Sequence, residues 1–199
     1  MSPYIESIKL KNGTLENLSW HQARFEKTRR ETMGIRKHPR LEQLVQVPDG
    51  LDEGLYKCRL IYGKSAERIE FEPYVNRVVR SLKLVFSETI SYSYKYTERA
   101  DLDTLYQMRG DCDDILIVKE GCLTDSYYAN VALWDGSVWV TPDSPLLPGT
   151  MRASLLAAGE LTEKVVRIEQ LDHFQRIRLI NAMSSLHEST DIFIEKIRS

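Results

Sequence analysis

The stretch from residue 113 to residue 152 constrains the fold more than any other part of this chain. It begins with the apolar run Ile115–Val118, which predicts a strand, and continues through an irregular segment that carries Asp125 and Asn130. Asp135-Gly136 then predicts the turn of a two-strand hairpin. A loop rich in proline and glycine follows and opens a helix, so the stretch predicts strands that lead directly into a helix N-terminus.

Two features of this stretch suit an anionic ligand that contains nitrogen. The segment Pro148–Met151 comes just before a helix predicted over Arg152–Ala158, where backbone N–H groups and the helix dipole favour a phosphate. Asp125 is expected between strands rather than on a solvated helix face, so its carboxylate is suited to hold a protonated ring nitrogen. The alternative is a turn aspartate that bonds its own backbone.

The charge balance argues against a nucleic-acid-binding protein. The 199 residues carry a formal net charge of -2, and the pI is about 6.1. A basic cluster occurs early in the chain, but acidic residues interleave it, so we interpret it as solvated surface. Its members are Lys27, Arg29, Arg30, Arg36, Lys37 and Arg40.

Cysteine content and hydropathy favour a soluble cytoplasmic protein. The three cysteines, Cys58, Cys112 and Cys122, are an odd number without metal-ligand spacing. We interpret them as reduced intracellular thiols and predict no metal site. No apolar run approaches the roughly 18 residues of a membrane span, and the N-terminus has no signal pattern, so no membrane partner is expected.

Strands and helices alternate along the rest of the chain. Asn12-Gly13 predicts an N-terminal hairpin, Ser19 is expected to cap the first helix, and residues 87–93 form a polar connector. We therefore predict an α+β protein with mixed sheets. The connector divides it into an N-terminal lobe over residues 1–86 and a C-terminal lobe over residues 87–199.

The order of Lys95, Asp125, Asn130 and Gly149-Thr150-Met151-Arg152 resembles the class IV aminotransferase family, the fold type IV enzymes that use pyridoxal phosphate (PLP). The family includes branched-chain and D-amino acid aminotransferases and 4-amino-4-deoxychorismate lyase. The resemblance spans residues 4–182 and implies a two-lobed, D-amino acid aminotransferase-like fold, PLP as cofactor and a homodimer. Most members carry a further N-terminal segment, so a shortened N-terminus is expected here, with a pocket that is open, completed by a partner subunit or specialised for another substrate.

The resemblance implies that Lys95 forms the covalent link to PLP and that Asp125 holds the cofactor's ring nitrogen. From the residues alone, Lys95 is typical of an exposed strand lysine between Tyr94 and Tyr96. Asp125 stands where the family has a glutamate. Its side chain is shorter by one methylene, so either the backbone lies closer to the ring or a water intervenes.

The resemblance also implies a phosphate site. Gly149, Thr150 and Met151 would give backbone N–H groups to the phosphate, and Asn130 would bond the backbone around the cofactor. The segment His21-Gln22-Ala23-Arg24-Phe25 resembles a family motif whose arginine binds the same phosphate. A guanidinium fork matches phosphate oxygens well, although Arg24 is also consistent with a surface charge.

Lys57 and Arg99 are the predicted contacts to substrate carboxylates. Strand alternation places Lys57 and Arg59 on one face, which is either solvent-exposed or, by the resemblance, lines the cavity for a small-molecule amino substrate. Met151 before the arginine and Ala129 before the asparagine resemble the lyases.

Three functions remain open at this point. The first is a 4-amino-4-deoxychorismate lyase, which eliminates pyruvate to give 4-aminobenzoate. The second is a branched-chain or D-amino acid aminotransferase. The third is a PLP-binding protein without catalysis.

Overall fold

The computed structural model describes residues 3–198, and the chain forms two compact units. Unit 1 runs to Asn76 and includes Tyr94–Glu98, whereas unit 2 comprises Arg77–Ser93 and the chain from Arg99 onward. The boundary therefore differs from the expected division after residue 86. The reason is that β5 (Leu82–Phe86) pairs in parallel with β6 (Asp114–Lys119), which makes it part of the unit 2 sheet.

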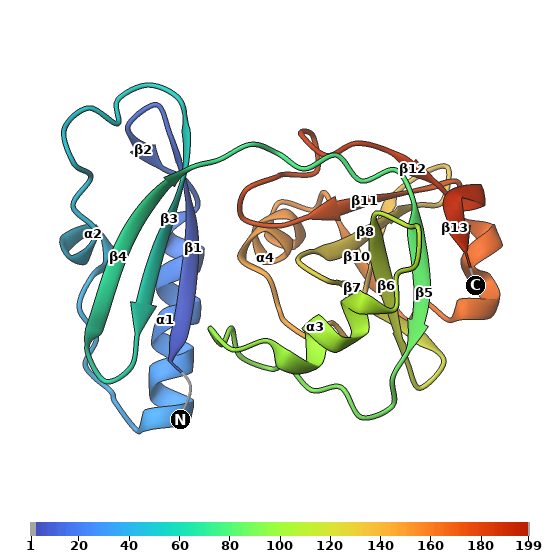
Figure 1. Ribbon diagram of the computed structural model, residues 1–199, viewed down its shortest axis with the longest axis horizontal. Coiled ribbons are helices and arrows are strands. Elements are labelled where there is room, and N and C mark those ends of the chain that lie inside the picture. Colours follow the sequence, from blue (N-terminus) through green and yellow to red (C-terminus); the bar gives the residue numbers. More distant parts are fainter. Residues whose placement is uncertain (1–2, 199) are drawn as a thin grey trace. The chain divides into compact units, whose positions relative to one another are not determined.

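Unit 1 is an antiparallel sheet with one long helix (Figure 1). The strand order is β2-β1-β3-β4, where the strands are β1 (Tyr4–Lys11), β2 (Thr14–Leu15), β3 (Leu55–Tyr62) and β4 (Ala66–Pro73). The predicted turn is confirmed, because Asn12 and Gly13 both have positive φ, 48° and 75°, as a tight two-residue hairpin requires. The returning strand is only two residues long.

The helices of unit 1 are α1 (Leu18–Met33) and α2 (Leu41–Leu44). The expected cap at Ser19 is wrong: α1 begins at Leu18, and Asn17, which adopts a left-handed conformation, is its N-cap. Gly34 ends α1 in the same conformation. Alternate residues of β1 and β3 pack with α1 and α2 in a core of Tyr4, Ile8, Phe25, Leu41, Val45, Cys58, Leu60 and Tyr62.

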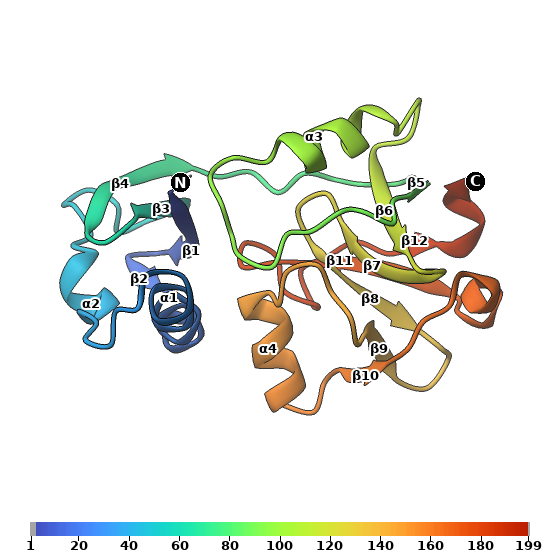
Figure 2. The same ribbon diagram turned by 90° about the horizontal axis from the view of Figure 1, so that it is seen from below.

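Unit 2 is a mixed sheet with strand order β10-β9-β8-β7-β6-β5-β13, and β11 joins it through β8 (Figure 2). The new strands are β7 (Cys122–Ser126), β8 (Asn130–Trp134), β9 (Trp139–Pro142), β10 (Thr162–Lys164), β11 (Arg176–Ile180), β12 (Ile192–Phe193) and β13 (Ile197–Arg198). The helical segments are α3 (Ala100–Gln107), α4 (Thr150–Ala157), η1 (Ile168–His173) and η2 (Ile194–Lys196). Strands 5 and 13 pair in parallel with their neighbours, whereas β6 to β9 are antiparallel.

Within unit 2 the predicted hairpin at Asp135-Gly136 is confirmed, because β8 and β9 are antiparallel neighbours in which Leu133 pairs with Val140. The expected irregular segment is more ordered than predicted, since Asp125 and Asn130 lie on β7 and β8 and are directly paired. The α+β class is confirmed, and the sheet of unit 2 is mixed as expected, whereas the strand pairs of the unit 1 sheet are antiparallel. Within residues 3–198, none of the helices has the length and apolar character needed to cross a membrane.

Candidate active site

Asp125 and Asn130 form the centre of a buried polar cluster in unit 2. The Asn130 side-chain amide donates to Asp125 Oδ1 at 2.7 Å, and the backbone N–H of Leu147 donates to Asp125 Oδ2 at 2.9 Å. The same amide nitrogen of Asn130 also donates to the backbone oxygen of Leu147 at 2.8 Å. One amide therefore joins two strands to the loop that precedes α4.

The environment of Asp125 changes its acidity. Burial raises the pKa of this carboxyl to about 7, although the hydrogen bonds from Leu147 and Asn130 and the positive charge of Arg152 act in the opposite direction. The side chain is only 6% exposed. A carboxyl in this state gains or loses a proton near neutral pH, so a cation placed beside it would favour the ionised form.

Gly149 is required by its contact with Asn130. A Cβ atom on Gly149 would lie 2.1 Å from Asn130 Oδ1, which is far shorter than any van der Waals contact. Helix α4 begins at the next residue, two residues earlier than predicted, and its first residues Thr150 and Met151 are buried. The loop, the start of the helix and the Asp125 carboxylate therefore form one closely packed structure, and the positive end of a helix dipole belongs to it.

Arg152 is a buried cation in the same cluster. Its Nη2 donates to the backbone oxygen of Pro142 at 2.8 Å and to Glu163 Oε1 at 2.5 Å. Among the described residues, neither its Nε nor the hydroxyl of Thr141 has a hydrogen-bond partner, although both are buried. The sequence identified Arg152 only as the end of a motif and not as a buried charge near Asp125.

Lys95 lies in unit 1 beside the first residues of β1. Its backbone oxygen accepts a hydrogen bond from the N–H of Ile5 at 2.9 Å, and Tyr96 forms an isolated bridge with Tyr4. The rings of Tyr4 and Tyr96 lie 5.0 Å apart, which packs the segment against the unit 1 core. Lys95 is half-buried, so the alternative of a fully exposed strand lysine does not describe it.

Arg24, on α1, contacts a buried carboxylate of β1. Its Nε and Nη2 donate to Glu6 Oε1 and Oε2 at 3.0 and 2.6 Å. His21 Nδ1 lies 2.6 Å from Glu6 Oε2. The charge of Lys95 acts on His21, so Arg24, His21 and Lys95 belong to one electrostatic environment.

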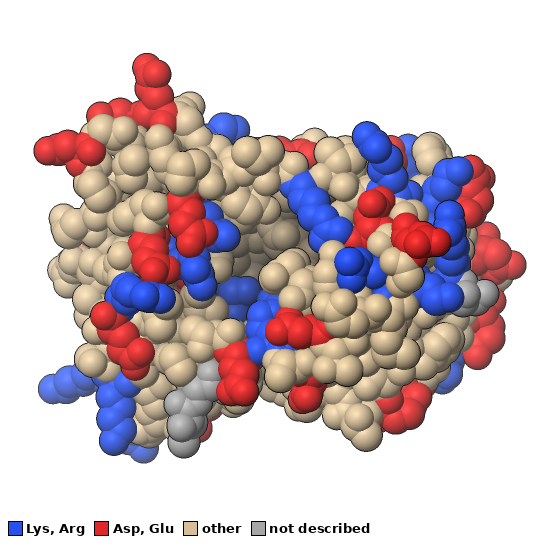
Figure 3. All heavy atoms as spheres, in the orientation of Figure 1, with Lys and Arg blue, Asp and Glu red and all other residues tan. Residues whose placement is uncertain are grey.

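Lys57 and Arg59 lie on one face of β3, as predicted. Lys57 pairs with Glu72 at 3.1 Å, and Arg59 pairs with Glu70 and Glu72 at 3.3 and 3.1 Å. All four side chains are partly exposed. Acidic and basic side chains also lie side by side elsewhere on the surface, as Figure 3 shows for one face of the protein. The carboxylates therefore balance the two cations within their own sheet.

Arg99, at the N-terminal end of α3, lies among tyrosines of unit 2. Its guanidinium carbon is 4.2 Å from the ring centre of Tyr128, 4.5 Å from that of Tyr127 and 5.6 Å from that of Tyr92. It also donates to the backbone oxygen of Tyr127. These contacts fix the side chain next to the short connection between Asp125 and Asn130.

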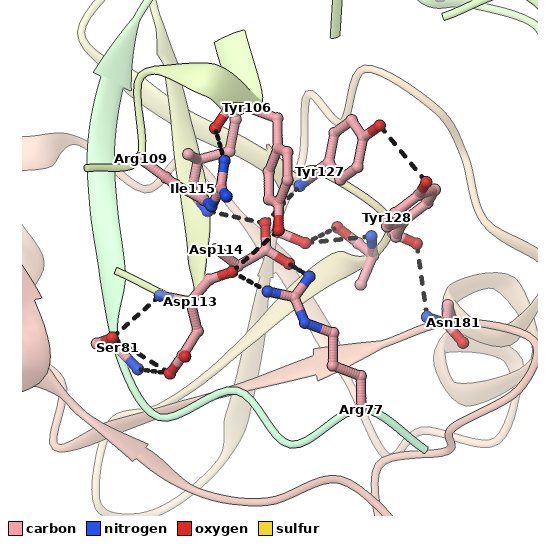
Figure 4. Close-up of polar contacts among 12 residues, drawn as sticks. Arg77, Ser81, Tyr106, Arg109, Asp113, Asp114, Ile115, Tyr127, Tyr128 and Asn181 are labelled. Atoms are coloured by element: carbon pink, nitrogen blue, oxygen red, sulfur yellow. Dashed lines mark hydrogen bonds and ion pairs between the residues drawn. The ribbon is translucent and has the colours of Figure 1, made fainter. Parts of the chain in front are cut away.

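Asp114 also contacts the connection between Asp125 and Asn130. Figure 4 shows the Arg77 guanidinium beside the backbone oxygen of Asp113 and the carboxylate of Asp114, with Tyr127 and Tyr128 nearby. Asp114 Oδ1 accepts from the N–H of Tyr127 at 3.4 Å, and burial raises the pKa of Asp114. No sequence pattern distinguishes this aspartate from the other acidic residues.

Apart from Lys57 and Arg99, the predicted site residues thus fall into two groups. Unit 2 brings together the predicted carboxylate, the asparagine and the loop before α4, and unit 1 brings Arg24 and Lys95 toward His21. Glu6 was not among the site residues predicted from the sequence. A signal was present, because alternation places this acid on the same side of β1 as Tyr4 and Ile8 of the core.

Comparisons with known proteins identify the family. The profile described as "Amino-transferase class IV" matches residues 93–188. An uncharacterized protein of Haemophilus influenzae is 37% identical over 188 residues, which cover 94% of this chain and 100% of the relative.

Solved structures agree with this assignment. A candidate 4-amino-4-deoxychorismate lyase from Haemophilus somnus is 34% identical with a TM-score of 0.88, over 94% of this chain and 98% of that one. A hypothetical aminotransferase from Mycobacterium tuberculosis in its PLP-bound form is 18% identical with a TM-score of 0.78, over 96% and 80% of the two chains, and shows the same fold. The chain is therefore an enzyme of the class IV aminotransferase family and has the fold type IV architecture.

Proposed function

We propose that the protein is a PLP-dependent enzyme of the 4-amino-4-deoxychorismate lyase type, which eliminates pyruvate from a small-molecule amino substrate and leaves 4-aminobenzoate. The observation that carries the proposal is the buried Asp125 carboxylate, held by Asn130 and by the loop that leads into α4. The 34% identity to a candidate lyase over nearly the full length of both chains supports the choice of reaction.

The residues of unit 2 fit the polar parts of PLP. Asp125 is buried, and burial opposes its ionisation, so a protonated ring nitrogen beside it would supply the counter-charge that the carboxylate needs. The absence of a Cβ at Gly149 keeps the backbone close to Asn130, and the following helix start favours a phosphate. We assign backbone N–H groups of Gly149, Thr150 and Met151 to this phosphate, together with the Arg24 guanidinium.

When bound, PLP supplies a ring that accepts electron density from the reacting carbon of the substrate. In our proposal Lys95 would hold the cofactor through Nζ, and its amine would take a proton from the substrate and return it. Asp125 would lie beside the ring nitrogen and, when ionised, would favour its protonated form. Lys57 and Arg99 are assigned to substrate carboxylates, and the pairing of Lys57 with Glu72 means that a substrate must compete with that glutamate.

The alternative within the family is an aminotransferase acting on branched-chain or D-amino acids. Two assays on the purified protein distinguish the reactions. A lyase releases pyruvate without an amino acceptor, whereas an aminotransferase consumes an amino acid only when 2-oxoglutarate is present. A protein that binds PLP but does neither would be a binding protein without catalysis.

The cofactor assignment is tested by the visible absorption spectrum with added PLP. We expect the wild type to develop the absorption band of lysine-bound PLP, and borohydride to fix the cofactor to the chain. Lys95→Ala should lose both properties, while Lys83→Ala, in β5, should retain them. A wild type that binds no PLP would contradict the proposal.

We further propose a homodimer that acts in the cytoplasm. The three cysteines are unpaired in the structure, which suits a reducing compartment. Sedimentation velocity of the PLP-loaded protein tests the dimer, because a species of about 23 kDa would contradict it.

A further inference from the structure

Glu6 is an unusual residue for the core of unit 1. It lies in the middle of β1 with no exposed surface. Its two carboxylate oxygens receive two donors from Arg24, at 3.0 and 2.6 Å, and contact His21 Nδ1 at 2.6 Å. A buried carboxylate is costly unless it is paired and hydrogen-bonded, so this set of contacts is what permits a charge at this position.

The protonation states of this cluster follow from its surroundings. Burial would raise the pKa of Glu6, but Arg24 and His21 outweigh burial and hold it at about 2. Burial lowers the pKa of His21, and the charges of Arg24 and Lys95 act in the same direction, although Glu6 opposes them. At neutral pH Glu6 is therefore ionised and His21 is neutral, and a neutral histidine bonded to a carboxylate carries its proton on Nδ1.

The geometry around Arg24 determines the direction of its guanidinium group. Glu6 engages one edge of the planar group, formed by Nε and Nη2. A two-point contact of this kind fixes the plane of the guanidinium and so the direction of its opposite edge. The side chain is 14% exposed, so most of it is enclosed.

We propose that Glu6 is a positioning residue, which orients the Arg24 guanidinium toward the cofactor phosphate and holds His21 in the Nδ1–H tautomer. This inference rests on the proposed function, because it assigns Arg24 to the phosphate of PLP. It adds two residues, Glu6 and His21, that touch neither the cofactor nor the substrate. They act through Arg24 and determine how well it binds an anion.

A competing account makes Glu6 only a counter-charge for Arg24. In that case Glu6 competes with the phosphate, and removing its charge should strengthen phosphate binding. If Glu6 positions Arg24, removing the charge of Glu6 should weaken phosphate binding. The two accounts therefore predict changes of opposite sign for one substitution.

The test is Glu6→Gln, with the dissociation constants of PLP and of pyridoxal, which lacks the phosphate, measured by absorption titration. An amide offers one acceptor oxygen, so it cannot accept from both nitrogens of Arg24 and from His21. We expect the affinity for PLP to fall by about tenfold, the effect of losing one charge-assisted hydrogen bond, and the affinity for pyridoxal to stay within about twofold. Equal losses for both ligands, no change, or tighter PLP binding would overturn the proposal.

Glu16→Gln is the matched control. Glu16 pairs at 3.3 Å with Lys9, which lies on β1 as Glu6 does. The substitution therefore removes a glutamate charge from the same unit without changing a partner of Arg24. We expect it to leave both affinities unchanged. If the wild type does not bind PLP, the proposed function itself is contradicted. If the wild type binds PLP but the Glu6 variant keeps the same preference for PLP over pyridoxal, only the role of Glu6 is contradicted.

A second measurement needs no variant that might fail to fold. The chemical shifts of the two ring nitrogens of His21, recorded by NMR on the wild-type protein at pH 7, report which nitrogen carries the proton. The proposal requires the Nδ1–H form. A charged ring or the Nε2–H form would overturn it, and folded Glu6→Gln should show a different tautomer population.

Discussion

At the scale of single residues, Asp125 makes the stability of the cofactor-free protein depend on pH. Its pKa is about 7 in the folded chain, because of burial, and about 3.9 in an unfolded one. Between these values the folded state binds more protons than the unfolded state, so the free energy of unfolding decreases as the pH rises from about 4 to about 7. A difference of about three pKa units corresponds to about 4 kcal/mol.

We therefore expect Asp125→Asn to remove this pH dependence. The asparagine resembles the protonated carboxyl and cannot ionise. In urea unfolding of the cofactor-free protein, the variant should gain stability relative to the wild type between pH 5 and pH 8, by up to about 4 kcal/mol. An identical pH dependence for both proteins would mean that Asp125 ionises normally in the folded chain.

At the scale of structural elements, the contact between Gly149 and Asn130 joins the start of α4 to β8. Gly149 has φ of -72° and ψ of 149°, which any residue can adopt. An alanine there would therefore destabilise the fold through the clash of its Cβ with Asn130 Oδ1 and not through backbone strain. We expect Gly149→Ala to lower the free energy of unfolding by about 1–3 kcal/mol, as overpacking does.

A double-mutant cycle identifies the origin of that loss. Asn130→Ala removes the clashing oxygen, so Gly149→Ala should cost much less in the Asn130→Ala background, with a coupling energy above about 1 kcal/mol. Gly63→Ala is the control, because its new Cβ would meet only the end of the Glu67 side chain. Additive effects at Gly149 and Asn130 would contradict the contact.

The elements that the sequence predicted well are those specified by local patterns. The turn at Asn12-Gly13, the hairpin at Asp135-Gly136 and the shared face of Lys57 and Arg59 all follow from neighbouring residues. The pairing of Asp125 with Leu147 could not be predicted in the same way, because it depends on how a loop 22 residues away returns to the strand.

At the scale of the whole molecule, the division of the chain depends on contacts between distant segments. Residues 94–98 belong to unit 1 because Lys95 and Tyr96 pair with residues near the start of β1, some 90 positions earlier. The polar connector over residues 87–93 suggested a boundary, but a composition change does not show which strand the next segment joins. The positions of Lys95 and Asp125 in the motif were identified by resemblance, whereas the partners of each side chain required the structure.

The two units contain buried acids with opposite responses to pH, and this gives a prediction for the whole chain. Glu6, in unit 1, has a pKa lowered to about 2, so the stability it contributes is present above its unfolded value of about 4.5 and is lost as the pH falls toward 2. This contribution is about 3 kcal/mol. Asp125, in unit 2, has its pKa raised and destabilises the folded state only as the pH rises above about 4.

Acidification should therefore weaken unit 1 before unit 2. Trp20 reports on unit 1, and Trp134 and Trp139 report on unit 2, so variants that keep only one set allow each unit to be followed by fluorescence during urea unfolding. Between pH 7 and pH 4.5 we expect the unit 2 midpoint to rise. The unit 1 midpoint should begin to fall below about pH 6.5, because the pKa of His21 is lowered in the folded chain and the unfolded chain takes up a proton that folded unit 1 does not. Below pH 4.5 the protonation of Glu6 should add a further fall, which Glu6→Gln should remove. A single transition at every pH, with both reporters coincident, would contradict separate responses of the two units and would show that the chain unfolds as one cooperative structure.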